Sequence, residues 1–328
     1  MRCYYVNRRA DGAITQQVVD RPENELPEGN TRVRVQWSSL NYKDALAATG
    51  HSGVARSLPH VPGIDAAGVV EASTSPDLPP GTPVIVTSYG LGSERWGGWS
   101  EQICVPSEWV IPLPGNLTAR EAMILGTAGI TAGIGLEKLQ LHGIVPGCGP
   151  VLVTGATGGV GILALRMLAQ QNYEVVAVSG KRAQWDRLRR FGAHQVLDRA
   201  ELVHANNRPL LPARWAGAID TVGGTTLGTI LRELRPGGCV AACGLVGGTE
   251  LTTTVYPFLL RGITLAGIDS GAYPRERRLA LWQRLANTWK PDCLEDVAIE
   301  TDLDHLHGQV QAILAGEIAG RVVVRLTA

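Results

Sequence analysis

The chain has 328 residues, of which 45% are hydrophobic and 18% charged, and its 30 basic residues are matched by 30 acidic ones. This length exceeds what one ordinary hydrophobic core encloses and therefore predicts two domains. The zero net charge provides no bulk positive field, which argues against nucleic acid and against an anionic membrane as partners.

The sequence carries no signal for export or for a membrane span. Residues 1–6 lack a long apolar region before a cleavage site, and no stretch reaches the roughly eighteen uncharged apolar residues of a membrane helix. The six cysteines have no framework spacing, which is typical of a reducing compartment. We therefore expect a soluble, cytoplasmic protein.

The first part of the chain is predicted to be rich in β-strands. Short β segments broken by Gly and Pro are expected at 31–35, 66–71, 82–86, 101–105 and 110–113. From about residue 118 the pattern changes, because Thr118 is predicted to cap a helix that continues to about Leu139.

Strand-like and helix-like segments then alternate. Strands are expected at 151–154, 174–178, 195–197, 217–221 and 239–243, and helices at 160–168, 181–191 and 227–234. This order favours crossover connections and a parallel, doubly wound sheet of the α/β class. After residue 257 we expect a strand at 263–268, helices at 275–289 and 303–314, and a closing strand at 321–326. The alternating block is therefore predicted to be inserted in the first domain, which the tail completes.

A glycine-rich turn, Gly155-Ala156-Thr157-Gly158-Gly159-Val160-Gly161, links the predicted strand 151–154 to the helix that follows. Gly158 would let the backbone approach a pyrophosphate, and Gly161 would let the helix pack close to the sheet. The phosphates would meet the free N–H groups at the helix start near Gly159. The alternative is a tight turn without a ligand.

The end of the next strand predicts which dinucleotide binds. An NAD-binding protein has Asp or Glu there for the ribose 2′-hydroxyl, whereas this chain has Ser179-Gly180-Lys181-Arg182. Two cations on the first turn of a helix oppose its dipole, and an adenosine 2′-phosphate would supply the missing anion. These four residues therefore favour NADPH as the cofactor. The alternative is a solvated basic turn.

Several longer strings resemble one family. They are WSSLNYKDALAATG (37–50), PGIDAAGVV (62–70), GTAGITA (126–132), VTGATGGVG (153–161), VAVSGK (176–181), WAGAIDTVG (215–223) and GGCVAACGL (237–245). Together they resemble the zinc-free medium-chain dehydrogenase/reductases of the YhdH/YhfP-type, quinone-oxidoreductase-like family, which includes the NADPH-dependent acryloyl-CoA reductases. The resemblance implies a doubly wound Rossmann domain, 119–257, inserted in a β-rich GroES-like domain, 1–118 plus 258–328. It also implies a homodimer.

The resemblance carries site residues with it. It implies cofactor contacts at Val160, Gly161, Ile162, Leu163, Leu245 and Ser270. It places Tyr42 beside the nicotinamide, where the phenol would donate a hydrogen bond to an enolate or deliver a proton. The alternative for Tyr42 is a packed side chain at a strand end with its hydroxyl bonded to backbone, and water is an alternative proton source.

Other polar residues near Tyr42 are expected to be structural. Asn41 and Asp44 would pin the loop around Tyr42, and Asp65 would be a buried hydrogen-bond partner rather than a base. Trp96 and Trp99 are expected to pack against the β-rich domain, and the alternative is that they wall a substrate slot. Zinc-containing relatives have a Cys ligand in the segment matching 41–44 and Gly-His-Glu where this chain has Gly63-Ile64-Asp65, so we expect no catalytic metal.

We therefore expect NADPH-dependent reduction of an activated C=C bond, with acryloyl-CoA converted to propanoyl-CoA by hydride transfer to the β-carbon without a metal. A quinone or enone reductase on the same scaffold is one alternative, because the motifs do not separate the two substrates. A non-catalytic NADPH-binding protein is another, because it would keep the same nucleotide turn.

Overall fold

The computed structural model describes residues 1–202, 208–292 and 294–327, and the chain divides into two compact units. The first unit contains residues 1–127, 271–287 and the described residues after 293, and the second contains 128–270 and 288–292. The expected boundaries at 118/119 and 257/258 thus differ from the observed ones at 127/128 and 270/271. The reason is that Thr127 is hydrogen-bonded to Asp65 of the first unit, whereas the strand Thr264–Gly267 belongs to the sheet of the second.

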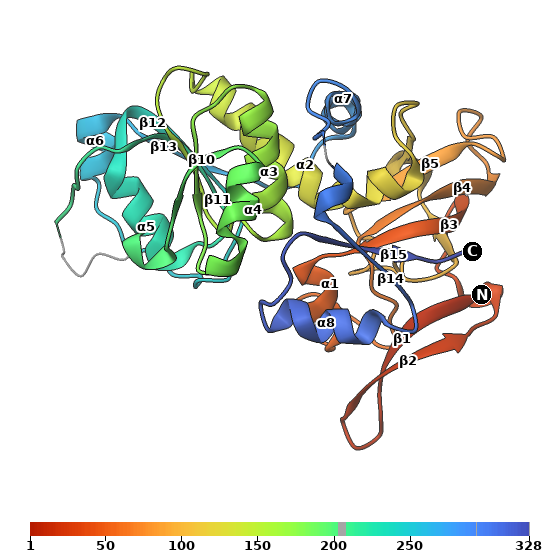
Figure 1. Cartoon of the computed structure of the whole chain (residues 1–328). Helices are drawn as coiled ribbons and strands as arrows, with labels where there is room; N and C mark the ends of the chain where they lie inside the picture. The colour runs from red at the N-terminus through yellow and green to blue at the C-terminus, as the bar shows by residue number, and fades with distance from the viewer. Residues whose placement is uncertain (203–207, 293, 328) are drawn as a thin grey trace. The chain divides into compact units, whose positions relative to one another are not determined.

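The first unit is built around a seven-stranded sheet (Figure 1). Its strand order is β14-β15-β3-β4-β5-β7, with β6 paired to β3 off this path. The strands are β3 (Thr31–Leu40), β4 (Asp65–Ser73), β5 (Pro83–Thr87), β6 (Gln102–Val105), β7 (Val110–Pro112), β14 (Ala298–Asp302) and β15 (Arg321–Arg325). The helices α1 (Tyr42–Ala48), α7 (Arg275–Ala286) and α8 (Leu306–Leu314) complete this unit, and α1 lies against α8.

The C-terminal strand closes this sheet, as the sequence predicts for the returning tail. Strand β15 pairs antiparallel with β3, with Val322 opposite Leu40, and the alternation along both strands sends Val and Leu side chains into one buried cluster. Trp99 is fully buried in that cluster and donates its indole N–H to Ser39 O across 2.9 Å, while Trp96 packs on its edge. Both tryptophans therefore have the packing role expected of them.

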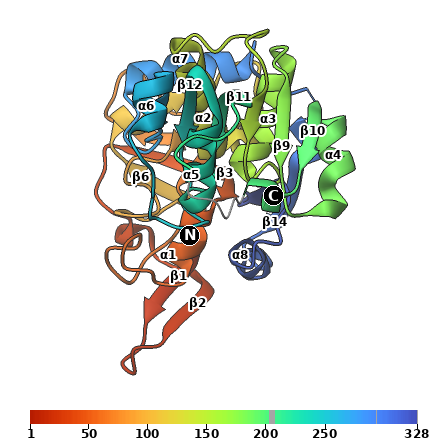
Figure 2. The same cartoon turned by 90° about the vertical axis from the view of Figure 1, so that its left-hand side faces the viewer.

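A two-stranded hairpin, β1 (Arg2–Arg8) and β2 (Ile14–Asp20), extends from the first unit (Figures 1 and 2). This hairpin is not among the elements predicted from the sequence. Strand β1 does bury Cys3, Tyr4 and Val6, but most of β2 is only half-buried, so β2 has no apolar face for the period-2 pattern to register. Helices α1 and α6 were also missed, because seven and six residues are too few to show an apolar helical period, and strand β14 was missed as well.

The second unit is a parallel sheet of six strands in the order β10-β9-β8-β11-β12-β13, which confirms the doubly wound prediction. The order reverses between β8 and β11. The strands are β8 (Val151–Val153), β9 (Val175–Val178), β10 (Ala193–Leu197), β11 (Trp215–Asp220), β12 (Leu234–Ala242) and β13 (Thr264–Gly267). The helices are α3 (Gly159–Gln170), α4 (Trp185–Arg190), α5 (Gly224–Glu233) and α6 (Tyr256–Arg261).

The helix α2 (Ala119–Leu141) carries the chain from the first unit into the second. Thr118 caps it as predicted, since its Oγ1 accepts the Glu121 N–H across 3.1 Å while Glu121 Oε2 accepts the Thr118 N–H across 2.9 Å. A break was not predicted: Gly126 has φ 49° and ψ −153°, a conformation that L side chains rarely adopt. By length and composition α2 matches a membrane helix, but 83% of its apolar window is buried, as in a core helix.

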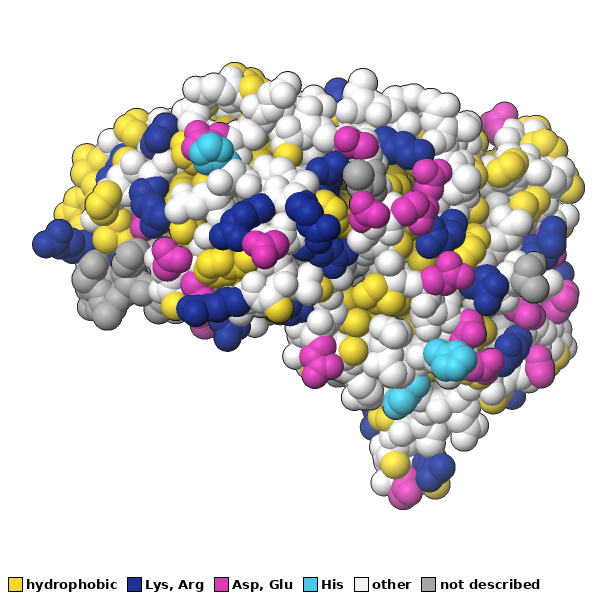
Figure 3. All heavy atoms as spheres, viewed as in Figure 1, with side chains coloured by type: hydrophobic (Ala, Val, Ile, Leu, Met, Phe, Trp, Pro, Cys, Tyr) yellow, Lys and Arg dark blue, Asp and Glu magenta, His cyan; other side chains and the backbone are white. Residues whose placement is uncertain are grey.

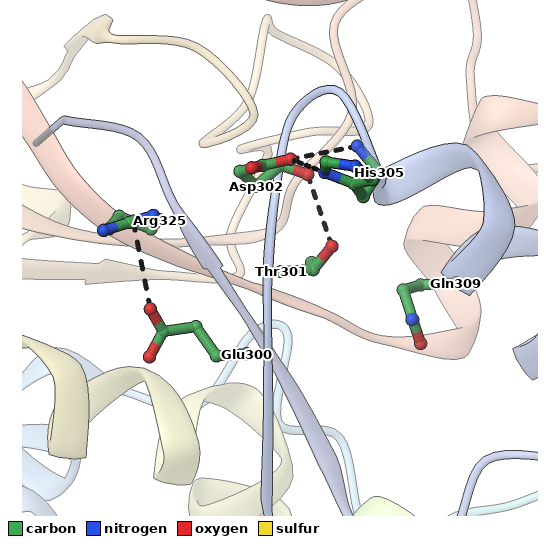
Figure 4. A pocket seen from close by; sticks show the side chains of 6 residues that line it. All are labelled: Glu300, Thr301, Asp302, His305, Gln309 and Arg325. Atoms are coloured by element: carbon green, nitrogen blue, oxygen red, sulfur yellow. Dashed lines mark hydrogen bonds and ion pairs between the residues drawn. The ribbon is translucent and has the colours of Figure 1, made fainter.

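Charges of both signs are interspersed on the face that Figure 3 shows, as expected from the zero net charge. A hollow of about 350 Å³ lies between β14, β15 and the start of α8 (Figure 4). Its charged groups pair with one another: His305 lies 2.7 Å from Asp302, and Arg325 lies 3.8 Å from Glu300. No residue of the predicted site lines this hollow.

Candidate dinucleotide-binding site and Tyr42 segment

The glycine-rich turn has the strand-to-helix setting that the sequence predicts. It begins after β8, and Gly158 is the N-cap of α3. No side chain caps the first turn of α3, and that turn contains no acidic residue, so its N–H groups and positive dipole end are available to an anion. This is the arrangement that a bound pyrophosphate requires.

Close approach explains Gly161, although not in the way expected. A Cβ at this position would overlap the Gly155 carbonyl, so Gly161 lets α3 fold back onto its own turn rather than onto the sheet. Gly155 has φ 56°, a conformation that favours glycine, and its carbonyl accepts the Gly158 N–H across 2.8 Å. The turn therefore requires glycine at position 155 for its backbone conformation and at position 161 for close packing.

The predicted contacts on α3 differ in exposure. Gly158, Gly159 and Val160 are half-buried at the start of the helix, whereas Ile162 and Leu163 have buried side chains in the core. Ile162 and Leu163 can therefore meet a ligand only through their backbone, and the Ile162 N–H already donates to Gly158 O across 2.9 Å.

The basic segment after β9 is a 3-10 turn, η3 (Arg182–Gln184), rather than the start of the expected helix 181–191. Helix α4 begins only at Trp185 and has Asp186 in its first turn, so the two cations do not oppose a helix dipole as predicted. Ser179 is buried at the strand end, where its hydroxyl accepts the Lys181 N–H across 3.1 Å. Gly180 is exposed beside it.

Two further charged groups border this segment and were missed by the sequence analysis. Asp198 accepts a hydrogen bond from Arg182 Nε across 3.1 Å, and the Ala200 N–H and this contact lower the pKa of its carboxyl. Arg199 lies against Gly180, since a Cβ added there would be 3.0 Å from Arg199 Nε. No local sequence pattern marks Arg199, because it is the parallel register, with Leu197 opposite Val178, that puts position 199 beside 180.

The remaining predicted cofactor residues follow other strands of the same sheet. Leu245 lies after β12 with its side chain 59% exposed, and Ser270 lies after β13, where its hydroxyl accepts a hydrogen bond from Thr131 across 2.9 Å. Because all six strands are parallel, the turn, Ser179–Arg182, Leu245 and Ser270 share the edge formed by the carboxyl ends of the strands. That edge is where open α/β sheets bind ligands.

Tyr42 belongs to the first unit and is the first residue of α1, not a residue at a strand end. Its side chain is 40% exposed, and its hydroxyl has no hydrogen-bond partner within residues 1–202, 208–292 and 294–327. The packed alternative with a backbone-bonded hydroxyl is therefore wrong. The phenol is available to donate a hydrogen bond.

The backbone around Tyr42 is held by buried polar side chains, as expected. Asp44 Oδ2 accepts the Asn41 N–H across 2.8 Å, and Asp44 Oδ1 accepts the Ile64 N–H across 2.7 Å. Burial, and secondarily the charge of Asp65, raise the pKa of Asp44 to about 7. Asp65 is fully buried and accepts hydrogen bonds from Ser39, Asn41 and Thr127, which makes it a structural centre.

No group of three or more His, Cys, Asp or Glu side chains suited to a metal occurs in the described part of the chain. Cys239 is buried in β12 and Cys243 is half-buried, with its thiol 3.5 Å from Asp220 O.

A Rossmann-type sheet with an uncapped glycine-rich turn, together with a β-rich unit closed by the C-terminal strand, defines a dinucleotide-dependent oxidoreductase of the medium-chain type. Residues 27–115 match the family model described as "Alcohol dehydrogenase GroES-like domain", and residues 159–287 match the one described as "Zinc-binding dehydrogenase". The GroES-like and Rossmann predictions are thereby confirmed.

Individual relatives cover nearly the whole chain. The Escherichia coli "Probable acrylyl-CoA reductase AcuI" is 45% identical over 316 residues, covering 96% of this chain and 97% of the relative. The Bacillus subtilis "Putative quinone oxidoreductase YhfP" is 44% identical over 303 residues, covering 92% of each, and its structure with NAD bound matches with a TM-score of 0.96 over 99% of both chains. The YhdH oxidoreductase of Salmonella enterica in complex with NADP is 42% identical and matches with a TM-score of 0.97 over 100% of both chains. The chain belongs to the YhdH/YhfP-type family of the medium-chain dehydrogenase/reductases.

Proposed function

We propose that this chain reduces acryloyl-CoA to propanoyl-CoA with NADPH as the hydride donor. The proposal rests chiefly on the identity of 45% to a protein named as a probable acrylyl-CoA reductase, which spans 96% of this chain. It needs a hydride at the β-carbon of the thioester, stabilisation of negative charge on the thioester oxygen, and a proton at the α-carbon.

The residues of the second unit fit NADPH. The uncapped first turn of α3 (Gly159, Val160 and Gly161) would hold the pyrophosphate through its N–H groups. The hydroxyl of Ser179, with Lys181, Arg182 and Arg199, would hold the adenosine 2′-phosphate. NADPH supplies the hydride when bound. Leu245 and Ser270 would complete the cofactor site at the same sheet edge.

Tyr42 is proposed as the hydrogen-bond donor to the thioester oxygen and as the proton donor to the α-carbon. Its support is a half-exposed phenol at the start of a helix, without a hydrogen-bond partner in the described residues. Each turnover would convert the C=C double bond into a C–C single bond with two new C–H bonds, one from the hydride at the β-carbon and one from the proton at the α-carbon. Solvent would then return the proton to the phenolate.

The quinone reductase remains the second candidate, because the similarly related YhfP is named a putative quinone oxidoreductase. We would follow NADPH oxidation with acryloyl-CoA, crotonyl-CoA and 1,4-benzoquinone, each with and without a chelator. Preference for acryloyl-CoA, unaffected by the chelator, is the expected result. Preference for benzoquinone would overturn the thioester proposal, and loss of activity with the chelator would contradict metal-free chemistry. Oxidation with none of them would favour a non-catalytic NADPH-binding protein.

We also propose a cytoplasmic homodimer. Helix α6 exposes Leu259 and Leu260 together with Tyr256, and it lies in the unit whose sheet ends at the open edge strand β13. Leu259→Glu with Leu260→Glu should convert a dimer to a monomer in light scattering coupled to gel filtration. Leu141→Glu is the matched control, because Leu141 is 81% exposed elsewhere in the same unit. A wild-type monomer would refute the proposal.

A further inference from the structure

Arg321 is buried in the first unit and holds groups that are far apart in the sequence. Only 3% of it is exposed, and its guanidinium lies 4.0 Å from Asp65, which is fully buried. A buried ion pair is costly unless further hydrogen bonds satisfy both partners. Here they do: Arg321 Nε donates to Ile124 O across 2.9 Å, and Nη1 donates to Leu40 O across 3.3 Å.

The same pair caps both sides of the break in α2 at Gly126. Arg321 donates to the carbonyls of Ile124 and, more weakly at 3.5 Å, Met123, where the first part of the helix ends. Asp65 accepts the Thr127 N–H at both of its oxygens, each across 3.0 Å, where the helix resumes. Both partners are therefore tied to backbone on one side and cannot rotate freely.

On its other side the pair is bridged by the Asn41 side chain. Arg321 Nη1 donates to Asn41 Oδ1 across 3.0 Å, and Asn41 Nδ2 donates to Asp65 Oδ2 across 2.8 Å and to Asp44 Oδ2 across 3.0 Å. A flipped amide would put its oxygen against two carboxylates and its NH₂ group against the guanidinium. The charges thus permit one orientation of Asn41 only.

Asn41 is the N-cap of α1 and directly precedes Tyr42. Its backbone N–H donates to Asp44 Oδ2, three residues along, in a capping box, while its side-chain oxygen accepts from Arg321. The start of the Tyr42 helix is therefore anchored to the ion pair as well as to its own first turn.

We propose that Arg321 and Asp65 are positioning residues for Tyr42, acting through the Asn41 amide. The pair fixes the first turn of α1 and so the direction in which the phenol leaves the backbone. A change in that direction lowers the rate of a step that depends on Tyr42, because catalysis is sensitive to displacements of about 1 Å. This inference rests on the proposed role of Tyr42 in the reaction.

The test uses the full-length protein labelled with 3-fluorotyrosine, with the Tyr42 ¹⁹F resonance assigned by its loss in Tyr42→Phe. Arg321→Met should shift or broaden that resonance and lower kcat by about ten- to a hundredfold. The KM for NADPH should stay within about twofold, because the residues proposed to hold the pyrophosphate and the 2′-phosphate belong to the second unit. Arg321→Lys keeps the positive charge but lacks the planar guanidinium with its several N–H donors. It should restore the Tyr42 resonance and kcat in part.

Two comparisons separate positioning from loss of stability. Arg278→Lys is the matched control, because Arg278 is also fully buried in the first unit and donates to the backbone at Thr87 and Gly271. It should lower the Tm while leaving the Tyr42 resonance and kcat unchanged. In the Tyr42→Phe background Arg321→Met should lower kcat by no more than about twofold, since both changes remove the same contribution.

An unchanged Tyr42 resonance in Arg321→Met would overturn the inference. So would a double variant, Arg321→Met with Tyr42→Phe, whose loss of kcat equals the product of the losses in the two single variants. Should Arg321→Met fail to fold, Asn41→Ser breaks the same bridge and leaves both charges paired, and the same outcomes then decide. The resonance needs no substrate. A wild type that does not reduce acryloyl-CoA would therefore defeat the proposed function, while the Tyr42 resonance still decides the positioning.

Discussion

Thr154 donates its hydroxyl hydrogen to Asp220 Oδ1 across 2.6 Å, which joins the ends of strands β8 and β11 at the point where the sheet order reverses. Asp220 is fully buried, and its other oxygen accepts the Gly223 N–H across 2.8 Å. The Thr154 oxygen in turn accepts the Thr221 N–H across 3.0 Å. The residue immediately before the glycine-rich turn is thus fixed by a buried carboxylate.

Thr154→Val should therefore destabilise the protein and weaken NADPH binding. The substitution keeps the side-chain shape but removes the hydroxyl that donates to Asp220 Oδ1 and accepts the Thr221 N–H, at a cost of about 1–3 kcal/mol. Thr229→Val is the control, because Thr229 is equally buried on α5, away from the turn. Denaturant unfolding and NADPH titration measure the two effects. Equal losses of NADPH affinity in both variants would show that the Thr154 contact does not shape the turn.

The basic segment should set the preference for NADPH over NADH. Replacing Lys181 and Arg182 with Ala should raise the KM for NADPH by about ten- to a hundredfold, since charge-assisted hydrogen bonds contribute about 1.5–3 kcal/mol each. The KM for NADH should change little. Arg199→Ala alone should give a smaller effect of the same sign, and Arg189→Ala is the control on α4. Equal effects on the KM for NADPH and for NADH would refute the assignment. The comparison with NADH is needed because the structure of the relative YhfP contains NAD.

Tyr42→Phe tests whether the Tyr42 phenol is the proton donor. Loss of the hydroxyl should lower kcat by roughly a hundredfold if the phenol delivers the proton, while leaving the fold intact because the hydroxyl bonds nothing in the described residues. Tyr5→Phe, in the same unit, should leave kcat unchanged. A turnover number for Tyr42→Phe equal to that of the wild type would assign the proton to water.

The Asp44 carboxyl should make stability depend on pH. Its pKa of about 7 lies above the unfolded value of about 4, so between these pH values the folded state binds a proton that the unfolded state does not. The stability of the wild type relative to Asp44→Asn should therefore be greatest below about pH 4, fall as the pH rises, and level off above about pH 7. Urea unfolding of both proteins across this range measures it, and a constant difference would contradict the raised pKa.

Gly126→Ala should be among the most destabilising single substitutions in the first unit. Position 126 has φ 49°, and a Cβ there would lie 2.5 Å from Asp65 Oδ2. Gly316→Ala is the matched control, because it has φ 71° but no atom within 4 Å of the added Cβ. The control should cost only the backbone strain of about 1–2 kcal/mol. Thermal unfolding that places Gly126→Ala no lower than Gly316→Ala would show that the ion pair moves to accept the methyl group.

The sequence predicts well wherever local pattern decides the structure. The apolar period after Val160 identifies α3, and the alternation of strands and helices identifies the parallel sheet. Helix α1 was missed although Asn41 and Asp44 stand three residues apart, the spacing of a helix N-terminus. Its seven residues were too few for an apolar period.

The parts that resisted prediction depend on contacts between distant positions. Arg321 reaches Asn41 across 280 residues of chain, and nothing near Arg321 in the sequence marks it as more than a strand residue. Arg199 lies beside Gly180 only because β9 and β10 are in a particular register. Register and tertiary closure are set by the assembled core, so a single sequence does not display them locally.

The loop after β12 meets the loop after β11 backbone to backbone. A Cβ at Gly244 would overlap the Thr221 carbonyl, and one at Gly224 would lie 2.5 Å from Gly247 O. Gly224 and Gly244 therefore have no room for a side chain. Leu245 and Val246, in the same loop as Gly244, are 59% and 63% exposed. A redesign that uses this loop can therefore vary Leu245 and Val246, while Gly224 and Gly244 must stay glycine.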